Sequence, residues 1–269
     1  MSIFDFHIHA GDADTTTVLN FLDAIGAQRG AVLATDHGYW GEQYGTQISN
    51  DSVANMTAAS NGRLVGIASV NPAGSKNPAE ELEKALKLGM KGLKLYPHSG
   101  FYPNDKALWE TYELAQDSGI PVLVHTGIKA HKAHRMVFNN PVYVDDVAVD
   151  FPRLNLVIMH AGYPWVKEAL LLSRLNENVW MDLTFLDVLD YTFEQGLMEK
   201  TVRQCVEVLG TEKIVWGSEG WELGLPAYED EGIERVKKCI RKIESMDFLT
   251  TGDKEKIFSK NAEKLIFGI

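Results

Sequence analysis

The chain of 269 residues has the length of one α/β barrel, which takes roughly 250 residues. Hydrophobic residues make up 45% and charged residues 23%, a composition typical of soluble globular proteins. The net charge of −11 argues against nucleic acid and anionic membrane surfaces as partners, because an acidic chain repels both.

Short apolar runs alternate with longer amphipathic stretches along the chain. The apolar runs predict strands at Ile3–His9, Gly30–Thr35, Leu64–Val70, Gly92–Pro97, Pro121–Thr126, Asn155–His160, Val179–Thr184 and Lys213–Ser218. The stretches between them predict helices at Thr15–Gln28, Pro78–Leu88, Asn104–Ser118, Trp165–Asn176, Gln195–Leu209 and Tyr228–Met246, with a last helix near Lys254–Leu265.

Nearly continuous apolar strands such as PVLVH and LVIMH suit a parallel sheet that is buried on both faces. Eight strands alternating with helices predict a single (β/α)8 barrel (a TIM barrel), with residues 1–269 as one domain. An open doubly wound sheet is the alternative. It needs a glycine-rich phosphate loop after the first strand, and the pattern G-x-G-x-x-G does not occur.

Location is predicted from the N-terminus and the cysteines. The sequence MSIFDFHIHA has neither a basic segment nor a long apolar run, so we expect no signal peptide. No apolar stretch approaches the roughly 20 residues that cross a bilayer. Cys205 and Cys239 form no CxxC motif and are interpreted as core thiols in a reducing compartment. We therefore expect a cytoplasmic protein.

A His-x-His pair, His7 and His9, lies in the first predicted strand. Side chains two residues apart in a strand point the same way, so both imidazoles are expected to project into the barrel lumen. The apolar neighbours Phe4, Phe6 and Ile8 favour burial over an exposed histidine pair. Two neutral imidazoles side by side form a good part of a zinc site.

Two more predicted strands end in histidine, His125 in PVLVHTG and His160 in LVIMHAG. The C-terminal ends of barrel strands line the active face. A lone histidine there is usually a satisfied core residue. Three strands with inward histidines need a common explanation, because each buried imidazole needs a partner. A shared metal ion supplies one.

The eighth strand leads into VWGSEG, which places Glu219 at the strand exit. Its carboxylate is expected to bind the metal, to accept a proton from water, or to do both. The alternative is a solvated loop acid. Asp5 shares the face of the histidine pair deeper in the barrel and is interpreted as structural.

The loops after the strands should form the substrate pocket. Rings follow the second and fourth strands, where they are expected either to stack on a flat substrate or to anchor the loops: His37, Tyr39, Trp40, Tyr96, His98, Phe101 and Tyr102. After the fifth strand, GIKAHKAHR gathers Lys129, Lys132 and Arg135. This basic run favours an anionic substrate unless it is only a solvated loop.

The ordered motifs FDFHIHA, GLKLYP, VLVHTG, VIMHAG and VWGSE, followed by NAEKLIFGI, resemble the amidohydrolase-related family of metal-dependent hydrolases and decarboxylases over the whole chain. The resemblance implies one divalent ion, zinc first and manganese second. It implies His7, His9, His125 and Glu219 as ligands, with His160 and Glu219 as catalytic residues. Glu219 stands where the family normally has aspartate, so its longer side chain requires a shift of backbone or metal.

The resemblance also bears on the fourth and seventh strands. In the fourth strand, at the position of Lys94, some related hydrolases carry a carbamylated lysine that bridges two metals, but in this family the lysine is more often unmodified. Lys94 is therefore assigned, with Tyr96, His98, Lys129 and Arg135, to substrate binding. An acid often stands at the position of Asp182, where it is expected to hold a ligand histidine in place.

Three functions follow from these observations. The first is hydrolysis of a lactone, ester or amide in a small anionic molecule by metal-activated water. The second is a lyase reaction, the decarboxylation or hydration of an aromatic or unsaturated carboxylic acid. The third is a metal-free barrel that only binds a ligand. The expected partner is a small-molecule substrate. Members of such families often form oligomers, so a homo-oligomer is a further possibility.

Overall fold

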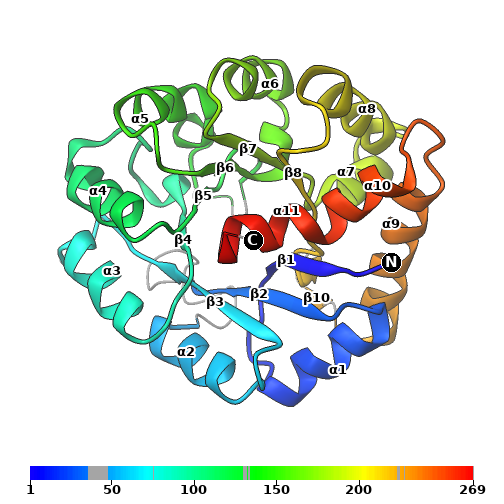
Figure 1. The fold of residues 1–269 in the computed structure, drawn as a ribbon, viewed down its shortest axis with the longest axis horizontal. Coiled ribbons are helices and arrows are strands. Elements are labelled where there is room, and N and C mark those ends of the chain that lie inside the picture. The colour runs from blue at the N-terminus through cyan, green and yellow to red at the C-terminus, as the bar shows by residue number, and fades with distance from the viewer. Residues whose placement is uncertain are drawn as a thin grey trace.

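The computed structural model describes residues 1–35, 48–74, 76–129, 132, 134–222, 225–226 and 228–268. Eight strands pair in chain order into one parallel sheet that curves into a barrel (Figure 1). They are β1 (Phe4–Ile8), β2 (Arg29–Leu33), β3 (Leu64–Ser69), β4 (Leu93–Leu95), β5 (Val122–Val124), β6 (Leu156–Ile158), β7 (Val179–Asp182) and β8 (Ile214–Val215).

Backbone hydrogen bonds join the first strand to the chain that continues from the last. The Phe6 amide donates to the Trp216 carbonyl at 3.1 Å, and the His9 amide donates to the Glu219 carbonyl at 3.0 Å. The predicted (β/α)8 barrel is confirmed. Each predicted strand overlaps one observed strand, and β2 begins one residue before its predicted range, at Arg29.

Helices form the outer ring of the barrel (Figure 1). They are α1 (Thr15–Ile25), α2 (Asn50–Ala58), α3 (Pro78–Lys87), α4 (Trp109–Asp117), α5 (Asp145–Asp150), α6 (Val166–Leu175), α7 (Leu186–Thr192), α8 (Leu197–Leu209), α9 (Asp230–Glu244), α10 (Thr251–Glu255) and α11 (Asn261–Phe267). Helix α1 begins after Asp14, whose carboxylate caps the helix by accepting a hydrogen bond from the Thr17 amide at 2.8 Å. The helices α2, α5 and α7 were not predicted.

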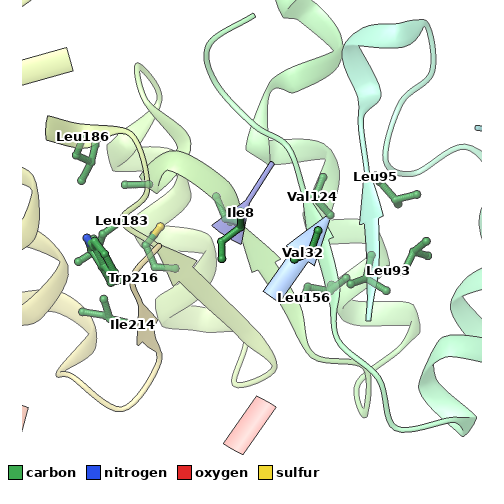
Figure 2. Close-up of a cluster of buried hydrophobic side chains, with 14 of the residues drawn as sticks. Ile8, Val32, Leu93, Leu95, Val124, Leu156, Leu183, Leu186, Ile214 and Trp216 are labelled. Atoms are coloured by element: carbon green, nitrogen blue, oxygen red, sulfur yellow. The ribbon is translucent and has the colours of Figure 1, made fainter. Parts of the chain in front are cut away.

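The core has two layers on either side of the sheet. The outer layer lies between strands and helices, where Figure 2 shows Ile8 of β1, Val32 of β2, Val124 of β5 and Leu156 of β6 among the buried side chains. The inner layer fills the lumen and combines strand residues with one face of α11, namely Phe4, Phe6, Ala31, Leu33, Val65, Ile67, Leu123, Val157, Met159, Trp180, Val215, Ala262, Leu265 and Ile266.

Helix α11 lies across the barrel at the N-terminal end of the strands (Figure 1). Its Phe267 ring lies 6.4 Å from the ring of Phe4 near the start of β1. The apolar plug therefore occupies one end of the lumen, and the polar side chains of the strands collect at the other end. That end carries the active site in barrel enzymes.

Two further predictions concern cysteines and membranes. Cys205 on α8 and Cys239 on α9 are both buried free thiols, as expected of core residues. Among the described helices, none has the length and apolar character that a membrane span requires.

Candidate metal centre

The centre begins with the two histidines of the first strand. The pairing of β1 with β2 shifts its register between Asp5 and Ile8, close to the point where the histidines leave the sheet. His7 is fully buried and His9 is partly buried. Their Nε2 atoms lie 3.2 Å apart, so the predicted convergence of the two imidazoles occurs.

Glu219 completes the group from the loop after β8. Its Oε2 atom lies 3.5 Å from His7 Nε2, and its Oε1 atom lies 3.7 Å from His9 Nε2. The residue has a φ of 73°, in the left-handed region that residues other than glycine rarely adopt. A backbone held in this region is often found at a functional site.

The geometry of the three residues fits a divalent cation. In a tetrahedral zinc site with bonds of about 2.0–2.1 Å, neighbouring ligand atoms lie about 3.3 Å apart. The ligand atoms of His7, His9 and Glu219 all lie within 4.8 Å of one another. Glu219 Oε2 is buried and has no hydrogen-bond partner among the described residues. A cation would satisfy this oxygen and both imidazoles together.

Electrostatics prepares the imidazoles for this role. Burial, and after it the charge of Lys94, lowers the pKa of His9 to about 3, and burial likewise holds the pKa of His7 well below its usual value. Both rings are therefore neutral at pH 7, as metal binding requires. Burial raises the pKa of Glu219 to about 8, so a proton occupies this carboxylate when no cation does.

His160 lies beside the group, at the exit of β6. Its Nδ1 atom lies 4.0 Å from Glu219 Oε2 and 3.1 Å from the Thr184 carbonyl oxygen. Its own backbone is left-handed, with a φ of 56°. The centroid of its ring also lies 5.5 Å from that of His7, so His160 belongs to the same buried group of side chains.

His125 contacts the centre through His160. Its Nδ1 atom lies 3.3 Å from His160 Nε2, and its Nε2 atom lies 2.8 Å from the Ile128 carbonyl oxygen. If each imidazole donates to its neighbouring carbonyl, the two nitrogens that face each other both present lone pairs. A cation between them would remove that repulsion. In this structure His125 is not within the 4.8 Å group of His7, His9 and Glu219, so its ligand role stays a prediction.

Two buried groups support the histidines from the fourth and seventh strands. Lys94 Nζ lies 3.5 Å from His7 Nε2, and burial lowers the pKa of Lys94 to about 8. Asp182 accepts hydrogen bonds from the Thr184 hydroxyl at 2.5 Å and from the His160 amide at 3.2 Å. Its Oδ2 atom also lies 3.8 Å from His7 Nδ1. Asp182 thus contacts two of the histidines that the sequence singled out.

The predicted substrate residues divide into two sets. Tyr96 is buried and its hydroxyl donates to the Ala34 carbonyl at 3.0 Å. His98 is also buried, with its ring centroid 4.5 Å from that of His125. Lys129 and Arg135 are exposed, and the Lys129 ammonium donates to two backbone carbonyls of its own loop. The rings of His37, Tyr39 and Trp40, and His131 in the basic run, lie outside the described residues.

Two residues next to His98 were not assigned a role from the sequence. His134 stacks on His98 with ring centroids 4.2 Å apart, and Asn139 Nδ2 lies 3.2 Å from His98 Nδ1. Both are buried. In the sequence, His134 was only one member of a basic run. Asn139 belongs to the tripeptide NNP, which is typical of an ordinary turn.

A cavity of about 500 Å³ lies outside this centre, between α7 and α9. None of the histidines described above lines it. Its lining is charged and includes Asp187, Asp190, Arg235 and Lys242. It is therefore a separate feature of the outer wall.

Comparison with known proteins gives one family and several similar structures. The family model described as amidohydrolase matches residues 4–268. An uncharacterized TIM-barrel protein from Bordetella bronchiseptica is 19% identical, covers 98% of both chains and has a TM-score of 0.78. A probable 2-pyrone-4,6-dicarboxylic acid hydrolase from Acinetobacter baumannii, solved with citric acid bound, is 17% identical, covers 100% of both chains and has a TM-score of 0.70.

A decarboxylase has a similar fold. The 2,6-dihydroxybenzoate decarboxylase from Rhizobium is 14% identical, covers 99% of this chain and 98% of its own, and has a TM-score of 0.68. Among curated proteins, the protein fluG of Emericella nidulans is 23% identical over 100 residues. That match covers 37% of this chain and 11% of the length of fluG.

Proposed function

The chain belongs to the amidohydrolase family, and on this premise we propose that it is a metal-dependent hydrolase acting on a lactone, ester or amide carbonyl of a small anionic substrate. The observation that carries the proposal is the carboxylate of Glu219, which faces the Nε2 atoms of His7 and His9 at 3.5 and 3.7 Å with a buried oxygen to spare. Such a group can bind a cation and accept a proton at the same place.

His7, His9 and Glu219 would hold the cation, with His125 as a further ligand. We propose zinc, because neutral imidazoles and one carboxylate at tetrahedral spacing are its usual ligands, with manganese as the alternative. When bound, a divalent cation supplies Lewis acidity, which acidifies water and polarises a carbonyl group.

The chain's own residues would manage the proton. The Glu219 carboxylate would accept a proton from the attacking water and return it to the leaving group. His160 lies beside it, with Nδ1 4.0 Å from Glu219 Oε2. Without a cation, burial raises the pKa of Glu219 to about 8, so its carboxyl group holds a proton more tightly than an ordinary glutamate does. Asp182 fixes the backbone of His160 through the amide hydrogen bond at 3.2 Å.

An anionic substrate is supported by Lys94. The ammonium group is fully buried beside His7, and with a pKa of about 8 it remains largely charged at pH 7. A buried positive charge attracts a substrate carboxylate strongly, because little water screens it. The exposed Lys129, Lys132 and Arg135 would add a weaker attraction from the loop after β5.

A lyase is the second candidate, and the protonation of Glu219 favours it. Decarboxylation leaves a carbanion that needs a proton. If the histidines alone hold the cation, Glu219, with a pKa raised to about 8 by burial, can supply that proton at neutral pH. The fold shared with the Rhizobium decarboxylase is compatible with this reaction. Released product separates the two candidates: a new acid group indicates a hydrolase, and carbon dioxide indicates a decarboxylase.

The first experiment is elemental analysis of the purified protein. We expect about one zinc or manganese ion per chain, lost in the double variant His7→Ala/His9→Ala. The metal-loaded protein should then release acid from lactones that carry carboxylate groups. A protein that takes up no metal after reconstitution, and turns over neither lactones nor aromatic acids, would leave only the binding role.

A further inference from the structure

The carboxylate of Glu219 is carried by a turn whose conformation needs outside support. Glu219 and Gly220 are left-handed in succession, with φ values of 73° and 65°. A β-carbon at Gly220 would lie 2.8 Å from the His9 amide nitrogen and 2.9 Å from the His9 carbonyl oxygen, so the turn presses against β1. Because glutamate resists this conformation, surrounding contacts must impose it.

Three hydrogen bonds hold the turn, two of them to β1 and the residue that follows it, and one within the turn itself. The Ser218 amide donates to Asp5 Oδ1 at 2.8 Å, and the Gly220 amide donates to the Ser218 hydroxyl at 3.1 Å. The His9 amide donates to the Glu219 carbonyl at 3.0 Å. Asp5 also accepts from the His7 amide at 3.2 Å, so one buried carboxylate ties the turn to the first histidine.

A fourth contact reaches the turn from the outer wall. Arg235 on α9 donates from Nη2 to the Ser218 carbonyl at 2.7 Å and from Nη1 to Asp187 Oδ2 on α7 at 2.7 Å. The side chains of Arg235 and Asp187 are only 9% and 12% exposed. The planar guanidinium thus bridges a helix and the turn in one fixed geometry, which the flexible ammonium of a lysine cannot reproduce.

A neighbouring ion pair joins α7 and α9 without reaching the turn. The Lys242 ammonium on α9 donates to Asp190 Oδ2 on α7 at 2.6 Å, and among the described residues it makes no hydrogen bond to the turn. Both pairs line the same cavity between α7 and α9. Only the Arg235 pair continues inward to the residue before Glu219, so joining the two helices does not account for it.

We infer that Arg235, held by Asp187, is a positioning residue that sets the Ser218–Glu219–Gly220 turn and thereby the direction of the Glu219 carboxylate. The inference rests on the proposed metal site and adds to it a control point outside the barrel. Asp187 orients the guanidinium, the guanidinium fixes the Ser218 carbonyl, and the next residue presents its carboxylate to His7 and His9. Groups that orient a ligand in this way typically change metal affinity by about 10- to 100-fold when removed.

The test compares Arg235→Met with Lys242→Met in the full chain. Zinc affinity of the metal-free protein is measured by competition with a chromophoric chelator. We expect Arg235→Met to weaken zinc binding by about 10- to 100-fold, Lys242→Met to change it by less than about twofold, and Arg235→Lys to lie between them. Thermal unfolding of each metal-free variant checks that it folds.

A second measurement does not depend on metal. Amide hydrogen exchange at His9 and Gly220 reports the two bonds of the turn, and we expect exchange about tenfold faster in Arg235→Met but not in Lys242→Met. Equal zinc affinity in Arg235→Met and the parent, or equal losses in both methionine variants, would overturn the inference. A parent protein without zinc affinity would refute the metal site, and hydrogen exchange would still decide the role of Arg235. If Arg235→Met does not fold, Arg235→Lys and Asp187→Asn are measured in the same way.

Discussion

Glu219 combines a position at the exit of β8 with a backbone conformation that directs its long side chain toward the histidines. Its position at the exit of β8 follows from the strand pattern, and the family resemblance raised the question of how a glutamate replaces an aspartate there. The left-handed backbone gives a physical answer, since it changes the direction in which the longer side chain leaves the turn. The oxygens then lie 3.5 and 3.7 Å from the two histidines.

Metal binding should expel the proton that Glu219 holds. The folded metal-free protein has a Glu219 pKa of about 8, raised by burial, so the carboxyl group is mostly protonated at pH 7. A cation must displace this proton, and affinity should therefore rise with pH up to about 8 and then level off. Calorimetry at pH 7 in buffers of different ionisation enthalpy should find about one proton released per zinc ion.

The variants Glu219→Gln and Lys94→Met assign that proton. Glu219→Gln should abolish most of the release, because the amide has no proton to lose in this range. Lys94, whose pKa is about 8, could contribute to the release, and Lys94→Met removes that contribution. Zinc affinity that stays constant between pH 6 and 8 in the parent protein would contradict this account.

Some residues of the centre were predictable and others were not. His7 and His9 were predicted because they lie in an apolar strand, and Glu219 because it follows the eighth strand. His134, Asn139 and Arg235 gave no such signal, because they lie in a loop and on a helix whose approach to the site depends on tertiary packing. Their neighbours in sequence are ordinary loop or helix residues.

At the scale of elements, strand positions were predicted better than helix positions. A buried parallel strand is a short apolar run, and that pattern survives even where the observed strand is only Val122–Val124. Helix α5 has six residues and α7 has seven, too short for a helical period to be read. Helix α2, with the sequence NDSVANMTA, is polar and buries only Val53, Ala54 and Met56.

The contact between β1 and the segment after β8 should be sensitive to one methyl group. A β-carbon at Gly217 would lie 2.5 Å from the His7 β-carbon, 2.6 Å from the His7 amide nitrogen and 2.9 Å from the Thr184 hydroxyl. Two of these atoms belong to or adjoin the backbone and cannot swing away. Gly217→Ala should destabilise the protein by about 1–3 kcal/mol in urea unfolding, and it should also weaken zinc binding because His7 is displaced.

Gly252→Ala is the matched control for that substitution. Gly252 lies in α10, and the nearest atom to an added β-carbon is the Thr250 hydroxyl at 3.8 Å. Alanine in a helix is about 0.5–1 kcal/mol more favourable than glycine, so this variant should be slightly stabilised. If Gly217→Ala unfolds at the same urea concentration as the parent, the strand contact is looser than the distances indicate.

At the scale of the whole molecule, the alternation of strands and helices was enough to predict a closed barrel. The sequence did not predict that one end of the barrel lumen is apolar and the other end polar. This division depends on α11, which fills the N-terminal end of the lumen with Ala262, Leu265 and Ile266. The period of a helix indicates that one face is apolar, but the surface that this face covers is known only once the barrel has closed.

The two ends of the barrel should therefore respond differently to mutation. Leu265 is 3% exposed and packs in the lumen cluster with Phe4 and Trp180, at the end away from His7. Leu265→Ala should lower the free energy of unfolding by about 2–5 kcal/mol, because it leaves a cavity in a closely packed core. Zinc affinity should stay close to that of the parent, since the ligand atoms lie at the other end of the strands.

Leu175→Ala, at a site on α6 that is 73% exposed, controls for the loss of a leucine and should change stability by less than about 0.5 kcal/mol. If Leu265→Ala weakened zinc binding as strongly as Gly217→Ala, the packing at the α11 end of the barrel would be coupled to the metal centre at the opposite end.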